Sequence, residues 1–103
     1  MSEARWHDLG PAEGYDDEKL HGCRVSGVPL CVGRSGDRWF AIEDTCPHAG
    51  GSLTEGMLDE DLVICPLHAY AFEIATGRCI DDPRCGVSCY PIRLDGSTLQ
   101  VKL

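Results

Sequence analysis

Two short segments of this chain each place one cysteine beside one histidine. The first reads C-P-H at residues 46–48, the second reads C-P-L-H at residues 65–68, and sixteen residues lie between the two segments. Thiolate and imidazole ligands suit iron and zinc. Common zinc sites use C-x-x-C pairs, so a C-x-H beginning is unusual for one. Two cysteines and two histidines also form the ligand set of a [2Fe–2S] centre that carries its histidines on one iron. The spacing therefore predicts a metal centre with the ligands Cys46, His48, Cys65 and His68.

The sequence around these ligands resembles the Rieske [2Fe–2S] family. The run C-P-H-A-G-G-S-L followed by C-P-L-H carries the resemblance, and residues 38–44, Thr76-Gly77 and residues 90–96 extend it. It is closest in character to the small branch, which comprises Rieske-type ferredoxins of ring-hydroxylating dioxygenases and small subunits of assimilatory nitrite reductase. The resemblance implies one [2Fe–2S] cluster, with Cys46 and Cys65 as buried ligands and His48 and His68 as exposed ones.

Short alternating segments bounded by glycine turns predict the strands that position these ligands. Strands over residues 28–33 and 38–43 form a hairpin that ends at Cys46. The apolar run 62–64 leads into Cys65, and an alternating segment over 70–74 follows His68. Further strands are expected within residues 90–94 and 99–103, whereas residues 1–22 read as a loop-rich lead-in around Trp6.

No segment longer than ten residues shows a helical period, which predicts an all-β fold. The resemblance implies a Rieske fold of stacked antiparallel sheets, like a sandwich or barrel. We expect a single domain over residues 1–103, with an inserted cluster-binding subdomain over about residues 45–72.

Charge and composition limit the partners and the compartment. The net charge of −8 and the sequence pI near 4.7 disfavour nucleic acid as a partner. No apolar run occurs near the start, so we expect neither a signal peptide nor membrane attachment. Seven cysteines without a paired spacing fit the reducing cytoplasm.

The ligand set and the family resemblance imply a one-electron carrier and not an enzyme in its own right. The resemblance implies that electrons pass from a flavin-containing reductase to an oxygenase or another terminal oxidoreductase. An alternative is the small Rieske subunit of an assimilatory NAD(P)H nitrite reductase, in which the large subunit is the partner. An alternative of another class is a structural zinc-binding interaction module. The donor, the acceptor and the oligomeric state stay open.

The surroundings of the cluster predict a low reduction potential. High-potential members carry a disulfide at the positions of Gly51 and Leu67, and hydroxyl donors at those of Tyr70 and Phe72. Phe72 donates no hydrogen bond, so the reduced charge is less stabilised, and the expected midpoint is below about +100 mV.

The remaining hydrophobic and sulfur-bearing residues have simpler interpretations. Leu53 and Met57 are expected in the apolar shell of the cluster, and Pro83 in a loop that covers it. Core positions are expected for Cys23, Cys31 and Cys79. A further ligand set or a redox pair formed by Cys85 and Cys89 stays an open alternative.

Overall fold

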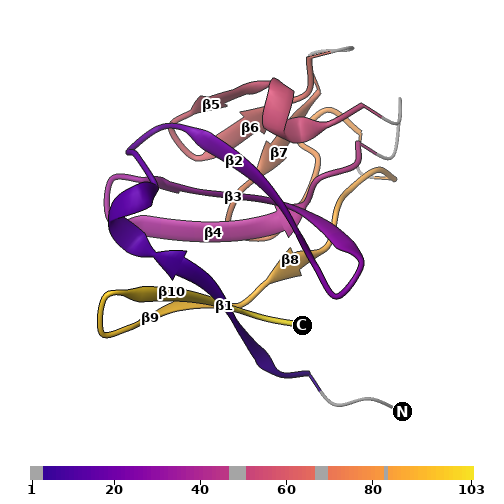
Figure 1. Ribbon diagram of the computed structural model, residues 1–103. Helices are drawn as coiled ribbons and strands as arrows, with labels where there is room; N and C mark the ends of the chain where they lie inside the picture. Colours follow the sequence, from indigo (N-terminus) through magenta and orange to yellow (C-terminus); the bar gives the residue numbers. More distant parts are fainter. Residues whose placement is uncertain (1–3, 47–50, 67–69, 83) are drawn as a thin grey trace.

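Antiparallel strands in three sheets make up the described part of the computed structural model, which comprises residues 4–46, 51–66, 70–82 and 84–103 (Figure 1). The strands are β1 (Trp6–Pro11), β2 (Leu20–Val25), β3 (Val28–Ser35), β4 (Arg38–Glu43), β5 (Met57–Asp59), β6 (Leu62–Ile64), β7 (Ala71–Glu73), β8 (Cys89–Tyr90), β9 (Ile92–Asp95) and β10 (Thr98–Lys102). Two 3₁₀ turns, η1 (Ala12–Gly14) and η2 (Leu53–Glu55), are the helical elements of these residues. The all-β prediction is confirmed. Over the described ranges, no helix is long and apolar enough to cross a membrane.

The sheet β2-β3-β4-β8 lies between the other two sheets and is covered on both faces (Figure 1). Its strand β3 shows this directly. Leu30 and Val32 belong to one buried cluster with Val101 of β10, whereas Cys31 belongs to a second cluster that contains Cys46. Because successive side chains of a strand point to opposite faces, β3 contributes to both cores at once. The second cluster contains Cys46 and Cys65, the two cysteines predicted as ligands.

The predicted hairpin of β3 and β4 is confirmed, and β2 extends it on the other side of β3. Ser26 and Gly27 join β2 to β3 with positive φ angles of 50° and 81°. A two-residue turn with positive φ at both positions has a twist that matches the two strands of a tight hairpin. Local turn chemistry therefore positions β2 against β3, beside the predicted hairpin.

The prediction that residues 1–22 form a loop-rich lead-in is wrong. They contain β1, which pairs with β10, and the start of β2. The pairing of β1 shifts register between Asp8 and Gly10, and Gly10 has a φ of 95°. This bulge interrupts the period-two pattern that identifies a strand in a sequence.

The apolar alternation over residues 90–94 also hides a change of sheet. Strand β8 pairs with β4 in the central sheet, and β9 pairs with β10 in the sheet β1-β10-β9. Pro91 lies between them and has no backbone N–H for a ladder hydrogen bond. The chain changes sheets at this residue, although its side-chain pattern continues.

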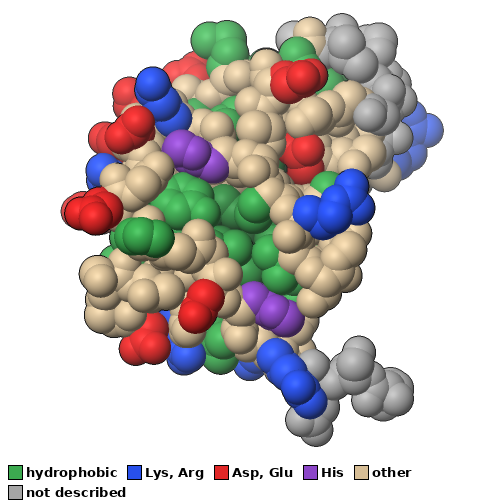
Figure 2. Space-filling model, in the orientation of Figure 1, with side chains coloured by type: hydrophobic (Ala, Val, Ile, Leu, Met, Phe, Trp, Pro, Cys, Tyr) green, Lys and Arg blue, Asp and Glu red, His purple; other side chains and the backbone are tan. Residues whose placement is uncertain are grey.

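The third sheet, β5-β6-β7, carries the second predicted ligand segment. Strand β6 leads into Cys65, as the sequence predicts, and pairs with β7 after the intervening loop. Strand β5 is only three residues long and is not predicted from the sequence. Figure 2 shows hydrophobic side chains over the middle of one face of the molecule, with acidic side chains at several places around them.

Candidate metal centre

Two of the four predicted ligands are described by the structure, and both are buried. The Cys46 and Cys65 side chains are 0% and 1% exposed and share one core cluster with Leu53, Val63 and Phe72. Cys46 follows β4, and Cys65 follows β6. Two different sheets thus direct a thiol into the same apolar region. This placement is expected for cysteine ligands that must be kept from water and from oxidants.

The two ligand segments begin with the same backbone geometry. The amide of Cys46 donates a hydrogen bond to the carbonyl oxygen of Gly51 at 2.8 Å, and the amide of Cys65 donates one to the carbonyl oxygen of Tyr70 at 2.8 Å. Each bond therefore closes a loop between a cysteine and the fifth residue after it. His48 and His68 belong to these loops by sequence but lie outside the described residues, so their ligand role stays a prediction.

A partly buried hydrogen-bond network supports the first loop. The Asp44 carboxylate accepts hydrogen bonds from the hydroxyls of Ser52 (2.7 Å) and Thr54 (2.6 Å) and from the Thr54 amide (2.9 Å). The Leu53 amide donates to the Asp44 carbonyl oxygen at 2.7 Å. Asp44 thus connects the end of β4 to η2 across the loop that begins at Cys46. Sequence reasoning missed this role because Ser52 and Thr54 are eight and ten residues away, beyond the range of local side-chain-to-backbone patterns.

A glycine allows the two ligand segments to approach each other. A Cβ atom at Gly56 would clash with the backbone carbonyl oxygen of Ile64, the residue before Cys65. No side chain fits there without a backbone shift. The chain that leaves the first ligand loop therefore passes directly against the strand that carries the second cysteine.

A third segment packs beside the two ligand segments. The Asp81 carboxylate accepts a hydrogen bond from the Ala71 amide at 2.7 Å, and the Ile80 amide donates to the Ala71 carbonyl oxygen at 2.9 Å. These bonds attach residues 80–82 to the start of β7. Pro83, expected to help cover the cluster, lies outside the described residues.

The other predicted apolar and sulfur-bearing residues divide into two groups. Leu53 is buried as expected, but the prediction for Met57 is wrong because its side chain is 65% exposed on the short strand β5. Cys31 and Cys79 occupy the core as predicted. Burial raises the pKa of Cys31 to about 12, although a hydrogen bond with Thr54 opposes this rise.

The residues that the structure describes fit a [2Fe–2S] cluster. Two inaccessible thiols lie in one apolar region, at the start of two matched loops. Thiolates are the ligands that iron–sulfur clusters require, and an apolar surrounding limits solvent access to them. The donor set is completed by the two histidines that the sequence places in the same loops.

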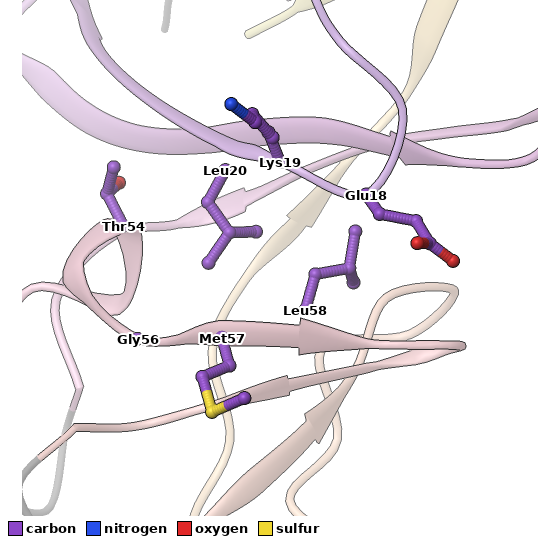
Figure 3. A pocket seen from close by; sticks show the side chains of 7 residues that line it. All are labelled: Glu18, Lys19, Leu20, Thr54, Gly56, Met57 and Leu58. Atoms are coloured by element: carbon purple, nitrogen blue, oxygen red, sulfur yellow. The ribbon is translucent and has the colours of Figure 1, made fainter.

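A separate groove on the surface does not share these properties. Glu18, Lys19, Leu20, Thr54, Gly56, Met57 and Leu58 line it, between the beginning of β2 and strand β5 (Figure 3). It contains one carboxylate and one ammonium group but no thiol or imidazole. We assign it no metal and no substrate.

Comparison with protein families gives one match over most of the chain. Residues 5–91 match the model of the Rieske [2Fe-2S] domain. The anthranilate 1,2-dioxygenase ferredoxin subunit of Burkholderia cepacia is 35% identical over 106 aligned positions, which cover 97% of this chain and 94% of that protein.

Two solved structures superpose closely on the fold. The complex of reduced oxygenase and oxidised ferredoxin in carbazole 1,9a-dioxygenase contains a chain that is 33% identical, with a TM-score of 0.83 and coverage of 92% of this chain and 99% of that one. A protein described as an NADH-dependent nitrite reductase small subunit from Mycobacterium tuberculosis has a TM-score of 0.92 at 23% identity, covering 99% of this chain and 97% of that one. At this identity the second match supports the fold alone.

Proposed function

Because this chain belongs to the Rieske [2Fe–2S] family, we propose that it transfers single electrons from a flavin-containing reductase to the terminal oxygenase of a ring-hydroxylating dioxygenase system. The observation that carries this proposal is the near full-length similarity to a dioxygenase ferredoxin subunit, which covers 97% of this chain. A related ferredoxin has been solved in complex with its oxygenase, which illustrates the kind of partner involved.

We assign the ligands of the single cluster to Cys46 and Cys65 on one iron and to His48 and His68 on the other. The burial of both cysteines and the two matched loops support this assignment. A cluster held by these residues would supply one-electron redox chemistry, at a potential that two neutral imidazoles would raise above that of a cluster with four thiolates.

The protein positions the ligand loops, excludes water from the two thiols and contributes surface charge. Asp44 connects the end of the first loop to β4 through its bonds with Thr54. Gly56 leaves room for the chain to pass against Ile64, the residue before Cys65. Leu53, Val63 and Phe72 are 0% exposed and share a core cluster with Cys46 and Cys65, which keeps water from the two thiols. The net charge of −8 favours association with basic surfaces on redox partners. We place these functions in one domain over residues 1–103.

The ligand assignment is tested by substitution with matched controls. Replacing each of the four ligands in turn with alanine should abolish iron binding and the visible absorption of the purified protein. Cys89→Ser and His7→Ala change the same residue types elsewhere and should retain two irons per chain. A ligand variant that keeps the iron content and spectrum of the parent protein would contradict the assignment. One bound zinc and no visible absorption would instead support a structural zinc module.

The electron-transfer role is tested with purified partners under anaerobic conditions. The dithionite-reduced protein is mixed with the oxidised terminal oxygenase of the Burkholderia cepacia anthranilate system, and reoxidation is followed by visible absorption. We expect rapid transfer that slows at high salt, since charge complementarity is screened by ions. Reoxidation no faster than in buffer would argue against this class of acceptor.

The nitrite reductase alternative predicts a different physical state. A stable subunit elutes with a large enzyme when untreated cell extract is fractionated by size, whereas a ferredoxin elutes alone. The close superposition on the small-subunit structure keeps this second candidate in the test, although it supports only the fold. Elution with a sirohaem enzyme, together with no transfer to the oxygenase, would replace our proposal by this one.

A further inference from the structure

Two cysteines outside the proposed ligand set lie opposite each other beside the metal centre. Arg78 and Gly86 form an antiparallel bridge, and the Val87 amide donates a hydrogen bond to the Gly77 carbonyl oxygen at 2.8 Å. In this register the next opposed pair is Cys79 and Cys85. Opposed residues of antiparallel segments have Cα atoms about 4.5–5.5 Å apart. That separation falls within the range of about 4.4–6.8 Å that a disulfide spans.

The surroundings of the side chains agree with this register. Burial raises the pKa of the Cys85 thiol, and the neighbouring Cys79 thiol adds to this rise. Cys85 is half-buried and packs against the core cluster that contains both Cys79 and Cys46. The two sulfur atoms are therefore neighbours on the same side of the paired segments, next to a proposed cluster ligand.

Cys89 does not take part in this pair. Its thiol donates to the carbonyl oxygens of Ile74, at 3.7 Å, and Ala75, at 3.5 Å. The sequence left a pair of Cys85 and Cys89 as an open alternative, whereas the backbone register places Cys79 opposite Cys85.

We propose that Cys79 and Cys85 form a reversible disulfide in the cluster-loaded protein when it meets a low-molecular-mass disulfide such as oxidised glutathione. Cys85 reacts first because it is partly accessible, whereas Cys79 is only 1% exposed. The Cys85 thiolate attacks one sulfur of oxidised glutathione, forming a mixed disulfide and releasing one reduced glutathione. Cys79 then loses its proton to solvent and attacks the Cys85 sulfur, which releases the second glutathione. Two thiols are oxidised, and one molecule of oxidised glutathione is reduced to two thiols.

The disulfide would link Cys79 and Cys85, which lie before and after the third segment (residues 80–82) in the chain. Residues 80–82 already bind to the start of β7 through Asp81 and Ile80. A covalent link between Cys79 and Cys85 closes the loop that contains them. The protein would then carry a thiol switch at the edge of its metal centre, in addition to its proposed electron transfer.

Tryptic peptides provide a direct test. The cluster-loaded protein is incubated anaerobically with oxidised glutathione, remaining thiols are alkylated, and the protein is digested. Cleavage after Arg78, Arg84 and Arg93 places Cys79 in peptide 79–84 and Cys85 in peptide 85–93. We expect these two peptides to be linked, with the loss of two free thiols, and we expect dithiothreitol to separate them.

Variants identify the sulfur atoms, because peptide 85–93 also contains Cys89. Cys89→Ser should retain the linked peptides, and Cys85→Ser should abolish them. Visible absorption is recorded throughout and should persist while the link forms. The proposal is overturned by a stable glutathione adduct on Cys85 without closure, by a link through Cys89, or by a link that forms only after the absorption is lost. None of these readouts requires a redox partner, so the outcome is independent of the proposed electron-transfer role.

Discussion

Replacement of Asp44 by alanine should release the first ligand loop from the end of β4. The carboxylate accepts three hydrogen bonds, two from Thr54 and one from Ser52. A hydrogen bond to a charged group contributes about 1.5–3 kcal/mol. Asp44 is only half-buried, and water can replace part of what is lost. We therefore expect a destabilisation of about 3 kcal/mol, which is less than the sum of three separate bonds.

The assay is the rate at which visible absorption is lost in guanidinium chloride, because cluster release makes unfolding irreversible. If the interactions of Asp44 are broken in the transition state for unfolding, about 3 kcal/mol accelerates the loss by about two orders of magnitude. Thr54→Val keeps the amide bond but removes the hydroxyl, which bonds to the Asp44 carboxylate and to Cys31. The loss of about 1.5 kcal/mol should accelerate cluster release about tenfold.

Asp59→Ala is the matched control because it removes the same charge from an exposed position in β5. It should leave the rate within about twofold of the parent protein. The reasoning is refuted if Asp44→Ala also stays within twofold of the parent protein.

Three further predictions concern backbone conformation, pH and potential. Gly77→Ala should lower the melting temperature by about 10 °C or more, because Gly77 has a φ of 80° and an added Cβ would clash with the Val87 carbonyl oxygen. Gly96→Ala is the control, since Gly96 has a φ of 63° but open space around the added Cβ, and it should lower the melting temperature by less than half as much. Equal shifts would show that the clash is absent. Between pH 9 and pH 12 stability should fall by up to about 1.4 kcal/mol per pH unit through Cys31, because the unfolded thiol ionises near its ordinary pKa of 9.0 while the native pKa is raised to about 12. Cys31→Ala should show a shallower pH profile in guanidinium unfolding, and parallel profiles would contradict this assignment. A redox titration should give a midpoint below about +100 mV, since Phe72 offers no hydroxyl near the cluster, and a higher value would refute the proposed role of the missing donors.

The sequence alone determined the chemistry and the class of fold. Cysteine and histidine types at their spacing predicted a metal centre, and the family resemblance favoured a [2Fe–2S] cluster over zinc, which also binds two thiols with two imidazoles. Alternation and glycine turns identified the all-β fold and the hairpin of β3 and β4, because these signals depend on residues that are close in the chain. The burial of Cys46 and Cys65 followed correctly from the family resemblance.

Only the tertiary structure decided the features that depend on distant segments. The pairing of β1 with β10 joins the two ends of the described chain, and a bulge at Gly10 hides β1 from a search for alternation. Likewise, Asp44 became a support of the ligand loop only when η2 folded back onto it. The position of Cys79 opposite Cys85, on which the proposed disulfide rests, follows from the backbone register of the bridge between Arg78 and Gly86. A hydrogen-bond register between segments is a property of the assembled backbone, so residue types and spacing do not specify it.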